Sequence, residues 1–197
     1  MKTLIVLNGE LKSPEYLKKL SSDSDFVICA DGGYDKAKSA GVKPDVLIGD
    51  MDSVECLDFD GEIYTFPSEK DETDCELAIR FAIEKGADEV ILTCALGGRY
   101  DHALANLSLL LNFSCAKIME KDCVIFRCTT CELFGEKGKT FSIIPFTDTV
   151  VSLESVKYPT EYVKFSSGTS LGISNEFIGD TAKITVHEGK ALIFINE

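Results

Sequence analysis

The sequence predicts an α/β fold: a Rossmann-like parallel sheet flanked by helices, followed by a smaller antiparallel domain of the β-sandwich type. Short apolar runs alternate with helical patterns over the first two thirds of the chain, which is typical of βαβ units. From about residue 124 the pattern changes to short alternating runs broken by Gly, Asp and Pro. The sequence shows no internal repeat and no long linker. We therefore expect two closely packed domains, residues 1–124 and 125–197.

Six apolar runs are expected to form the parallel sheet, each followed by a turn or a polar stretch: residues 4–7, 26–30, 46–48, 63–66, 90–94 and 117–119. Ser13 followed by Pro14 combines an N-cap with a proline at the first helical position. This pair predicts a helix that continues through Leu20.

Two more helices are expected in the first domain. Thr73 and Glu76 form a T-x-x-E capping box, and Gly86 is placed to end the helix that follows. Asp101 is expected to cap a third helix. The apolar stripe of that helix would consist of Leu104, Leu107, Leu110 and Leu111.

The second domain is expected to contain six short strands, at residues 131–134, 140–144, 150–153, 162–165, 182–187 and 191–195. The segments 136–139 and 188–190 carry glycine between charged residues and are typical of hairpin turns. The segment 166–177 is rich in hydroxyl groups and glycine. It is long for a connection in a compact domain, and such loops are often functional. We interpret His187 as structural.

The composition is acidic, with 20 Lys and Arg against 33 Asp and Glu in 197 residues and a formal net charge of −13. This charge argues against a nucleic acid or an anionic membrane as partner, because a polyanion is repelled before specific contacts form. With 45% hydrophobic and 27% charged residues, the chain is expected to fold around a sizeable core. The first apolar run is too short for a signal peptide, and no segment approaches the ~18 apolar residues of a membrane span. We expect a cytoplasmic protein.

The eight cysteines allow disulfides, a metal site or buried thiols. Cys29, Cys75 and Cys94 lie in apolar or helical patterns, where a free thiol behaves as a small hydrophobe in a reducing compartment. A later cluster consists of Cys115, Cys123, Cys128 and Cys131. It holds one C-x-x-C pair but no second pair at zinc-finger spacing. We therefore favour buried thiols over a structural zinc site.

Four polar clusters follow strands of the expected parallel sheet, at residues 30–33, 48–53, 70–74 and 96–102. The carboxyl ends of parallel strands share one edge, and ligands of open α/β sheets bind outside that edge. We expect the functional site there.

Acidic residues dominate three of these clusters. Asp50 and Asp52 are two residues apart, so in an extended segment both side chains project the same way and can share a hard cation. Asp31 and Asp74 strengthen a Mg²⁺ hypothesis, because crowded carboxylates repel unless a cation joins them. The simpler alternative is that these acids are turn residues. For Asp71 and Asp74, the dipole of the next helix is also a sufficient reason.

The Gly-Gly-Arg segment 97–99 resembles a phosphate cradle, since its glycines expose backbone N–H groups and its arginine offers a planar fork. It is not a Walker A loop, and the sequence has no G-x-G-x-x-G. Lys70 would neutralise the neighbouring acids or contact phosphate. His102 beside Asp101 would be an acid–base pair, a nucleotide contact or an ordinary first-turn residue.

Several segments match a known family in order along nearly the whole chain: Ala-Asp-Gly-Gly at 30–33, Gly-Val-Lys-Pro-Asp at 41–45, Ile-Gly-Asp-Met-Asp-Ser at 48–53, Lys-Asp-Glu-Thr-Asp at 70–74, Gly-Gly-Arg-Tyr-Asp-His at 97–102 with Asn106, and Ser-Asn-Glu-Phe at 174–177. Together they resemble the bacterial type of the thiamine pyrophosphokinase (thiamine diphosphokinase) family. The resemblance implies a nucleotide-binding α/β domain, and a β domain for thiamine binding and dimerisation. It further implies a homodimer that converts ATP and thiamine to AMP and thiamine diphosphate with Mg²⁺.

The resemblance also implies roles for individual residues. Mg²⁺ and the triphosphate would be held by Asp31, Asp50, Asp52 and Asp74. The catalytic residues would be Asp50, Asp52, Asp71 and Asp74, with Asp71 or Asp74 orienting or deprotonating the thiamine hydroxyl. ATP would be bordered by Asp31, Gly32, Lys70, Gly98, Arg99, Asp101, His102 and Asn106. Thiamine would be bordered, at a site between two subunits, by Tyr158, Ser170, Ser174 and Asn175.

The sequence departs from the family pattern in two places. Met51 stands where an aromatic residue is common, and the chain has no tryptophan, so we expect Tyr158 to supply any stacking on thiamine. Two other functions use the same residues: a Mg²⁺-dependent phosphohydrolase that activates water, and a non-catalytic dimer that binds nucleotide or thiamine. Their products distinguish the three hypotheses.

Overall fold

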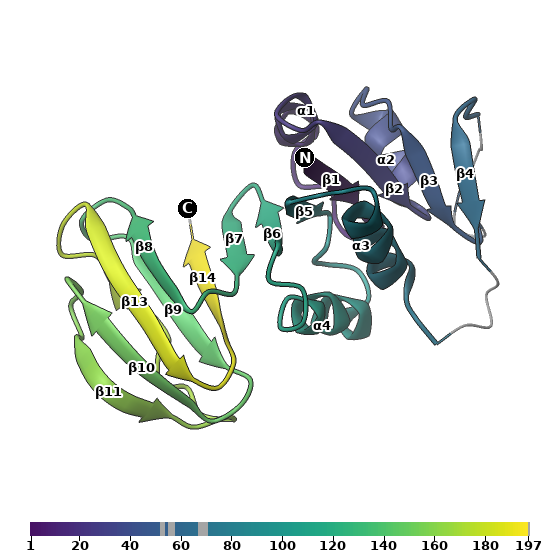
Figure 1. Ribbon diagram of the computed structural model, residues 1–197. Helices are drawn as coiled ribbons and strands as arrows, with labels where there is room; N and C mark the ends of the chain where they lie inside the picture. Colours follow the sequence, from purple (N-terminus) through teal and green to yellow (C-terminus); the bar gives the residue numbers. More distant parts are fainter. Residues whose placement is uncertain (52–53, 55–57, 67–70, 197) are drawn as a thin grey trace. The chain divides into compact units, whose positions relative to one another are not determined.

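The computed structural model describes residues 1–51, 54, 58–66 and 71–196 and divides the chain into two compact units (Figure 1). The first unit comprises Met1–Leu109 and Cys115–Lys121, and the second comprises Leu110–Ser114 and Asp122–Glu197. The chain passes from the first unit to the second for the last time between residues 121 and 122, close to the expected boundary after residue 124. Within the described ranges, no helix is long and apolar enough to cross a membrane.

The first unit is built on a parallel sheet with the strand order β6-β5-β1-β2-β3-β4. The strands are β1 (Lys2–Val6), β2 (Phe26–Ala30), β3 (Val46–Gly49), β4 (Glu62–Thr65), β5 (Glu89–Thr93) and β6 (Ala116–Glu120). All six strands expected in this unit are confirmed, with ends that differ by at most two residues. Because every pair is parallel, all carboxyl ends lie at the same edge of the sheet.

Two helices begin where their caps predict. Helix α1 (Pro14–Ser22) follows Ser13, whose hydroxyl accepts a hydrogen bond from the Tyr16 N–H at 3.2 Å. Helix α3 (Asp74–Glu84) follows Thr73, whose hydroxyl accepts from the Glu76 N–H at 3.3 Å. Each hydroxyl satisfies a backbone donor that the first turn leaves without a partner.

Helix α2 (Gly33–Ser39) was not among the expected helices. Its N-cap, Gly32, has no side chain that could signal a helix start. Helix α4 (Tyr100–Leu109) corrects a second expectation, because it begins before Asp101, which therefore lies inside the first turn instead of capping it.

The apolar stripe expected on α4 is also wrong. The helix ends at Leu109, before two of the four leucines, and Leu104 is 58% exposed. The buried residue of α4 is Asn106, because its amide turns inward to a backbone carbonyl of the β5 loop.

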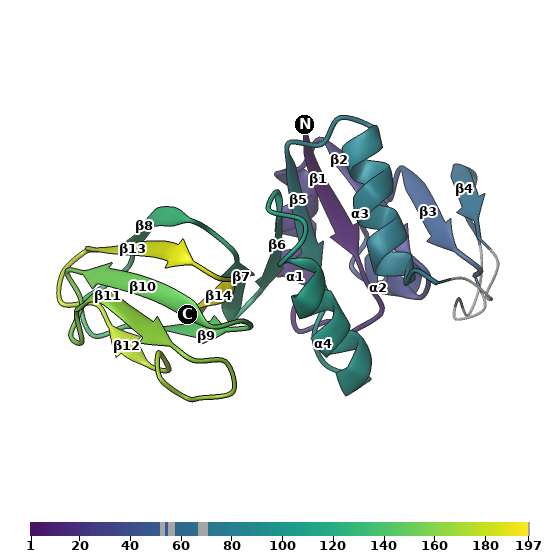
Figure 2. The same ribbon diagram turned by 60° about the horizontal axis from the view of Figure 1, so that its bottom comes forward.

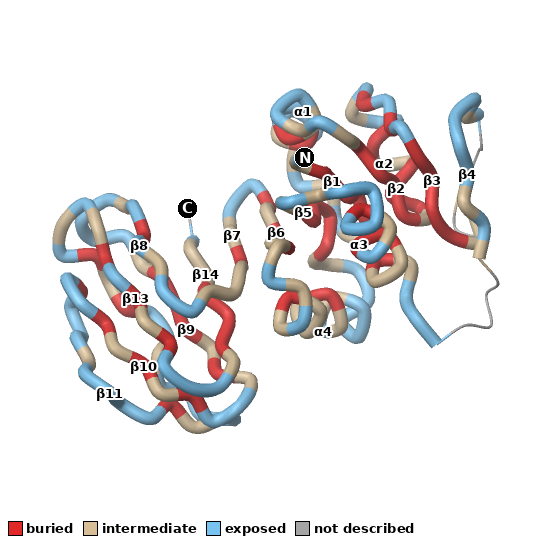
Figure 3. Tube along the Cα trace, viewed as in Figure 1, coloured by how far each residue is buried: buried red, intermediate tan, exposed pale blue. Residues whose placement is uncertain are grey.

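Helices cover both faces of the parallel sheet. Helix α3 packs on β1, β2 and β3 on one face, and α2 lies behind these strands on the other (Figure 2). The core on the α1 and α2 side combines Leu17 and Leu20 with strand residues such as Leu4, Val27 and Leu47. Figure 3 shows the central strands as buried, as expected for a parallel sheet with two covered faces.

The second unit is an antiparallel β-sandwich, as expected. One group of strands has the order β12-β9-β14-β7 and the other the order β11-β10-β13-β8. The strands are β7 (Cys123–Phe126), β8 (Thr130–Phe134), β9 (Thr140–Pro145), β10 (Thr149–Glu154), β11 (Thr160–Phe165), β12 (Asn175–Glu176), β13 (Thr181–Glu188) and β14 (Ala191–Asn196). Phe141, Phe165 and Phe177 lie fully inside its core. Strands β7 and β12 were not expected, whereas the other six were.

The two hairpins expected in this unit are wrong. Strand β8 pairs with β13, whereas β9 pairs with β12 and β14. Strand β13 pairs with β10 and β8, whereas β14 pairs with β7 and β9. At residues 136–139 and 188–190 the chain therefore crosses from one sheet to the other. Glycine-rich turns serve both kinds of connection, so the turn residues alone do not choose the partner strand.

Candidate functional site

The loops after three strands of the first unit pack against one another at the carboxyl edge of the sheet. The backbone N–H of Glu10, after β1, donates to the Leu96 carbonyl, after β5, at 2.9 Å. Gly32, after β2, lies so close to the Asn8 amide that any side chain at residue 32 would overlap it. The structure therefore brings together two of the four expected loops, those after β2 and β5, through the loop after β1 and its residue Asn8, which was not among the predicted site residues.

Asp31 joins the loop after β2 to the loop after β3. Its backbone N–H donates to the Ile48 carbonyl at 2.9 Å, and its Oδ1 accepts from the Met51 N–H at 3.1 Å. Gly49 has a φ of +142°, and a Cβ atom there would lie 2.7 Å from Asp31 Oδ1. Only glycine combines this backbone angle with so close a carboxylate. The carboxylate of Asp31 thus faces the loop that carries the half-buried Asp50.

The acids after β4 lie at the start of α3. Asp74 is the first residue of the helix, and Asp71 is exposed three residues before it. Asp52 and Lys70 fall outside the described residues. Within the described part of the chain, no three His, Cys, Asp or Glu side chains form a group that could hold a metal ion. The assignment of the four aspartates to one cation therefore stays a prediction.

The β5 loop presents backbone to its surroundings. Gly97 and Gly98 have φ of +81° and +65°, and no atom lies within 4 Å of the place a Gly98 side chain would occupy. Arg99 is 72% exposed and donates from Nε and Nη2 to the two carboxylate oxygens of Asp101, at 3.2 and 2.6 Å. This bidentate pair lowers the pKa of Asp101 to about 2. Asp101 also accepts from the His102 N–H at 3.0 Å, so it fixes the arginine at the start of α4.

Asn106, which was expected to border ATP, is buried and contacts the backbone of the loop after β5. It is 8% exposed, and its Nδ2 donates to the Ala95 carbonyl at 2.9 Å. On the other side of the same residue, the Ala95 N–H donates to Glu120 Oε1 at 2.8 Å. Glu120 was not selected from the sequence. The available signal was an acid placed directly after the apolar run 117–119.

In the second unit, the structure brings together two of the residues expected near thiamine. Asn175 is 5% exposed, and its Oδ1 accepts from the Tyr158 N–H at 3.1 Å while its Nδ2 donates to the Tyr158 carbonyl at 3.0 Å. The Tyr158 side chain is 60% exposed. Asn175 therefore fixes the backbone of Tyr158 and leaves its ring accessible.

The loop before Asn175 is exposed and partly apolar. Ser170 and Ser174 are exposed, and between them Leu171 and Ile173 are 51% and 50% exposed. Ser174 has a φ of +57°, and its N–H donates to the Ser142 hydroxyl at 3.0 Å. This hydrogen bond holds the loop on β9.

The cysteines in the described residues are free thiols. Cys29, Cys75 and Cys94 are buried, and burial raises the pKa of Cys75 and Cys94 to about 12. The sulfur atoms of Cys128 and Cys131 lie 2.8 Å apart, and both residues are half-buried. The described residues contain no group of three or more His, Cys, Asp or Glu side chains that could hold a metal ion.

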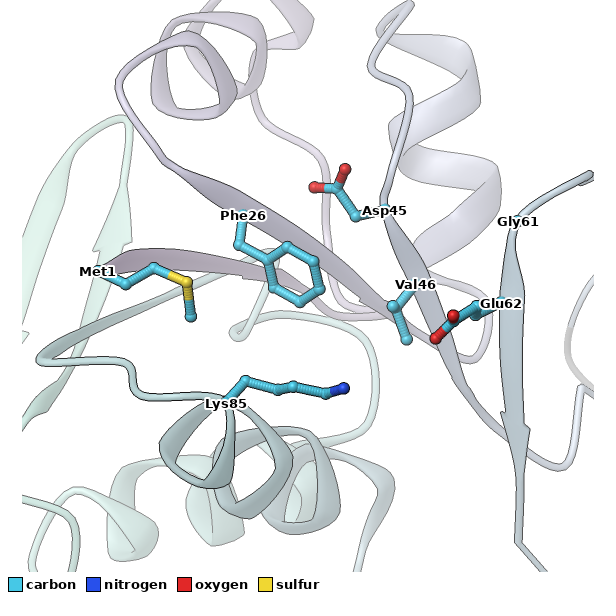
Figure 4. Close-up of a pocket in the computed structure, with 7 residues that line it drawn as sticks. All are labelled: Met1, Phe26, Asp45, Val46, Gly61, Glu62 and Lys85. Carbon is cyan, nitrogen blue, oxygen red and sulfur yellow. The ribbon is translucent and has the colours of Figure 1, made fainter.

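One cavity lies away from the candidate site. It has a volume of about 420 Å³ and is lined by Met1, Phe26, Asp45, Val46, Gly61, Glu62 and Lys85 (Figure 4). Most of these residues stand at or just before the amino ends of strands β1 to β4. The cavity is therefore at the edge of the sheet opposite the glycine loops.

His187 is held within its own sheet. Its Nε2 lies 2.8 Å from the Ser152 hydroxyl, and its ring stacks on Tyr162 with ring centres 4.1 Å apart. Both contacts are to residues of the same antiparallel sheet, on strands β10 and β11.

Residues 17–121 match the family described as "Thiamin pyrophosphokinase, catalytic domain", and residues 128–192 match "Thiamin pyrophosphokinase, vitamin B1 binding domain". The chain is 28% identical to the thiamine pyrophosphokinase of Bacillus subtilis over 96% of both chains. It is 33% identical to thiamine pyrophosphokinase 1 of Arabidopsis thaliana over 62% of this chain and 56% of the plant protein. The crystal structure of the Geobacillus thermodenitrificans thiamin pyrophosphokinase superposes with a TM-score of 0.85 at 28% identity, covering 100% of this chain and 98% of that one.

Proposed function

The chain belongs to the thiamin pyrophosphokinase family. We propose which of its residues bind the substrates and promote transfer of a pyrophosphoryl group from ATP to thiamine. The products of the family reaction are AMP and thiamine diphosphate. The observation that carries the proposal is the position of Asp31. Its carboxylate lies against the backbone of Gly49 and accepts a hydrogen bond from the Met51 N–H. The glycine loop of residues 97–99 begins at the same edge of the sheet.

The aspartates at this edge fit a magnesium ion by their chemistry. Mg²⁺ prefers oxygen ligands, and in nucleotide sites it takes one or two carboxylates together with phosphate oxygens and water. Asp31 and Asp50 follow adjacent parallel strands and supply such oxygens. We assign them to the cation together with Asp52 and Asp74. When bound, Mg²⁺ would neutralise charge on the triphosphate and let acidic side chains approach it.

The glycine loop and its arginine are the proposed triphosphate contacts, with Gly32 and Lys70 beside them. Gly98 is open on its side-chain side, so its backbone can approach phosphate oxygens closely. Arg99 keeps donors beyond the two that it gives to Asp101, since a guanidinium has five. Asp101 therefore orients Arg99 without using up its capacity for phosphate. His102 is exposed next to this pair and borders the nucleotide in our proposal.

The reaction needs positioning more than covalent catalysis. The thiamine hydroxyl must reach the β-phosphorus in line with the leaving AMP, and cationic groups must stabilise the charge that develops. We propose that Asp74 or Asp71 accepts the hydroxyl proton, or orients the hydroxyl for attack. Asp74 suits this role because the first turn of α3 fixes its backbone, whereas Asp71 lies on the exposed segment before the cap.

Thiamine recognition is proposed for the second unit, in agreement with the match of residues 128–192 to a vitamin B1 binding domain. The exposed ring of Tyr158 offers a stacking surface for a cationic heteroaromatic ligand. Ser170 and Ser174 offer hydroxyl groups on the neighbouring exposed loop. Asn175 contributes by fixing the backbone of Tyr158.

We also propose a homodimer in the cytoplasm. The exposed side chains of Leu171 and Ile173 would be covered in a dimer, and a site shared by two subunits would make dimerisation necessary for activity. The free thiols of the described cysteines agree with a reducing compartment. Sedimentation velocity measures the oligomeric state. A fully active monomer would contradict the proposed dimer.

The test of the function is a reaction with ATP, Mg²⁺ and thiamine whose products are separated by chromatography. We expect AMP to form only when thiamine is present. Phosphate release without thiamine would indicate a phosphohydrolase, and binding of both ligands without turnover would indicate a sensor.

A further inference from the structure

The loop after β5 is held from two sides at a single residue. The Ala95 N–H donates to Glu120 Oε1 at 2.8 Å, and the Ala95 carbonyl accepts from Asn106 Nδ2 at 2.9 Å. Glu120 is the last residue of β6 and is 3% exposed, whereas Asn106 lies on α4. Helix α4, which follows the loop, and strand β6, which pairs with β5, thus fix the first residues of the loop.

Glu120 is an unusual residue for such a position. Burial raises the pKa of Glu120, because taking a carboxylate out of water disfavours its charged form. The hydrogen bond from the Ala95 N–H, the nearby backbone N–H groups of Leu96 and Cys94, and the charge of Lys12 act against this rise in pKa. A buried carboxylate is costly unless it is hydrogen-bonded, and here the backbone of the loop supplies the hydrogen bonds.

The loop that Glu120 contacts has a strained path. Cys94, although not a glycine, has a φ of +51°, and Gly97 and Gly98 also have positive φ. A non-glycine residue in this region of φ is strained and persists only where its surroundings hold it. The two side-chain hydrogen bonds to the backbone of Ala95 therefore favour the path that brings the two glycines and Arg99 to the sheet edge.

We propose that Glu120 is a positioning residue for ATP binding: it holds residues 94–96 so that the backbone of Gly97 and Gly98 and the side chain of Arg99 face the triphosphate. This inference rests on the proposed role of the 97–99 loop. Glu120 acts through the loop and does not touch the substrate. Removal of the Glu120 side chain should therefore raise the KM for ATP more than the KM for thiamine.

The experiment measures the KM for ATP and for thiamine separately in purified variants. In Glu120→Ala we expect the KM for ATP to rise about tenfold, as for other supporting residues behind a binding site, with the KM for thiamine within twofold of wild type. In Glu120→Gln we expect a smaller rise, because the amide oxygen still accepts from Ala95. The KM for ATP should rise more in Glu120→Asp than in Glu120→Gln, because the shorter aspartate side chain withdraws its oxygens from the loop.

The matched control is Ile79→Val, which removes one buried methyl group from α3 in the same unit. It lowers stability without touching the loop, so both KM values should stay at wild type. Equal rises for ATP and thiamine in Glu120→Ala, or no rise, would overturn the inference. If Glu120→Ala does not fold, the order of the Gln and Asp variants decides.

Arg99→Ala separates this inference from the function on which it rests. If Arg99→Ala raises the KM for ATP and the Glu120 variants do not, the inference alone is wrong. If Arg99→Ala leaves the KM for ATP unchanged, the proposed role of the loop is wrong and the inference is overturned with it.

Discussion

The carboxylate of Asp31 lies directly against the backbone of Gly49, where a Cβ atom would come within 2.7 Å of Oδ1. The two residues end adjacent parallel strands, β2 and β3. Their contact has no room for a side chain at residue 49, and the φ of +142° at that residue is one that side chains rarely adopt. The close approach sets the distance between the Asp31 carboxylate and the loop of Asp50.

Gly49→Ala is therefore expected to displace Asp31 and to lower kcat/KM at least 100-fold, since a shift of about 1 Å in a reacting group has effects of this size. Gly86→Ala is the matched control. Gly86 also has a positive φ, of +91°, but nothing lies within 4 Å of its Cβ position. The control should lose about 1 kcal/mol of stability and keep its activity. Steady-state kinetics and thermal unfolding measure both effects, and equal activity in the two variants would contradict the role of Asp31.

Asp74→Asn is expected to abolish turnover and to leave the fold intact. The substitution keeps the shape of the side chain and removes its charge, at a cost of about 0.3–1 kcal/mol for the lost interaction with the helix dipole. The same result is expected for Asp52→Asn. Glu72→Gln, an exposed acid two residues before Asp74, is the control and should retain wild-type kinetics. Near-normal activity in purified Asp74→Asn would remove this residue from the site.

Asn175→Ala is expected to raise the KM for thiamine several-fold and to leave the KM for ATP unchanged. The substitution removes the two hydrogen bonds that fix the Tyr158 backbone and leaves its N–H and carbonyl without these partners. This loss should cost about 1–3 kcal/mol of stability. Asn112→Ala, an exposed residue of the same unit, is the control for both KM values. A rise in the KM for ATP alone would place thiamine recognition elsewhere.

The thiols are expected to differ in their rates of alkylation. The thiolate is the reactive form, so a raised pKa slows the reaction, and burial raises the pKa of Cys75 and Cys94 to about 12. The Cys128 S–H donates to the Cys131 sulfur, and this hydrogen bond lowers the pKa of Cys131. Iodoacetamide at pH 7.5 should label Cys131 well before Cys75 or Cys94, as followed by peptide mass spectrometry. Faster labelling of Cys94 would show that the β5 loop opens in solution.

Local signals predicted the elements that depend on local interactions. Ser13 and Thr73 cap their helices as expected, because a cap is formed within three residues of the chain. The strands of the parallel sheet were visible as apolar runs, because both faces of that sheet are buried. Pairing was not predictable in the same way. The connections at 136–139 and 188–190 join different sheets, which depends on distant strands and not on the turn residues.

The site shows the same division. Glycines and aspartates after strands were recognisable because they cluster after successive strands of the expected sheet and suit phosphate and cations. Asn8 and Glu120 act through contacts with loops more than 20 residues away in sequence, with Gly32 and Ala95 respectively, and nothing beside them in sequence indicates those contacts. Asn106 and Asn175 were expected beside the ligands, and both are buried, with hydrogen bonds to the backbone of Ala95 and of Tyr158 respectively.

Pyrophosphoryl transfer can be followed with ATP labelled at its β-phosphorus, incubated with Mg²⁺, thiamine and the purified protein. We predict that the label passes to thiamine diphosphate and that one AMP forms for each thiamine diphosphate. Formation of ADP, or of labelled phosphate without thiamine, would contradict it.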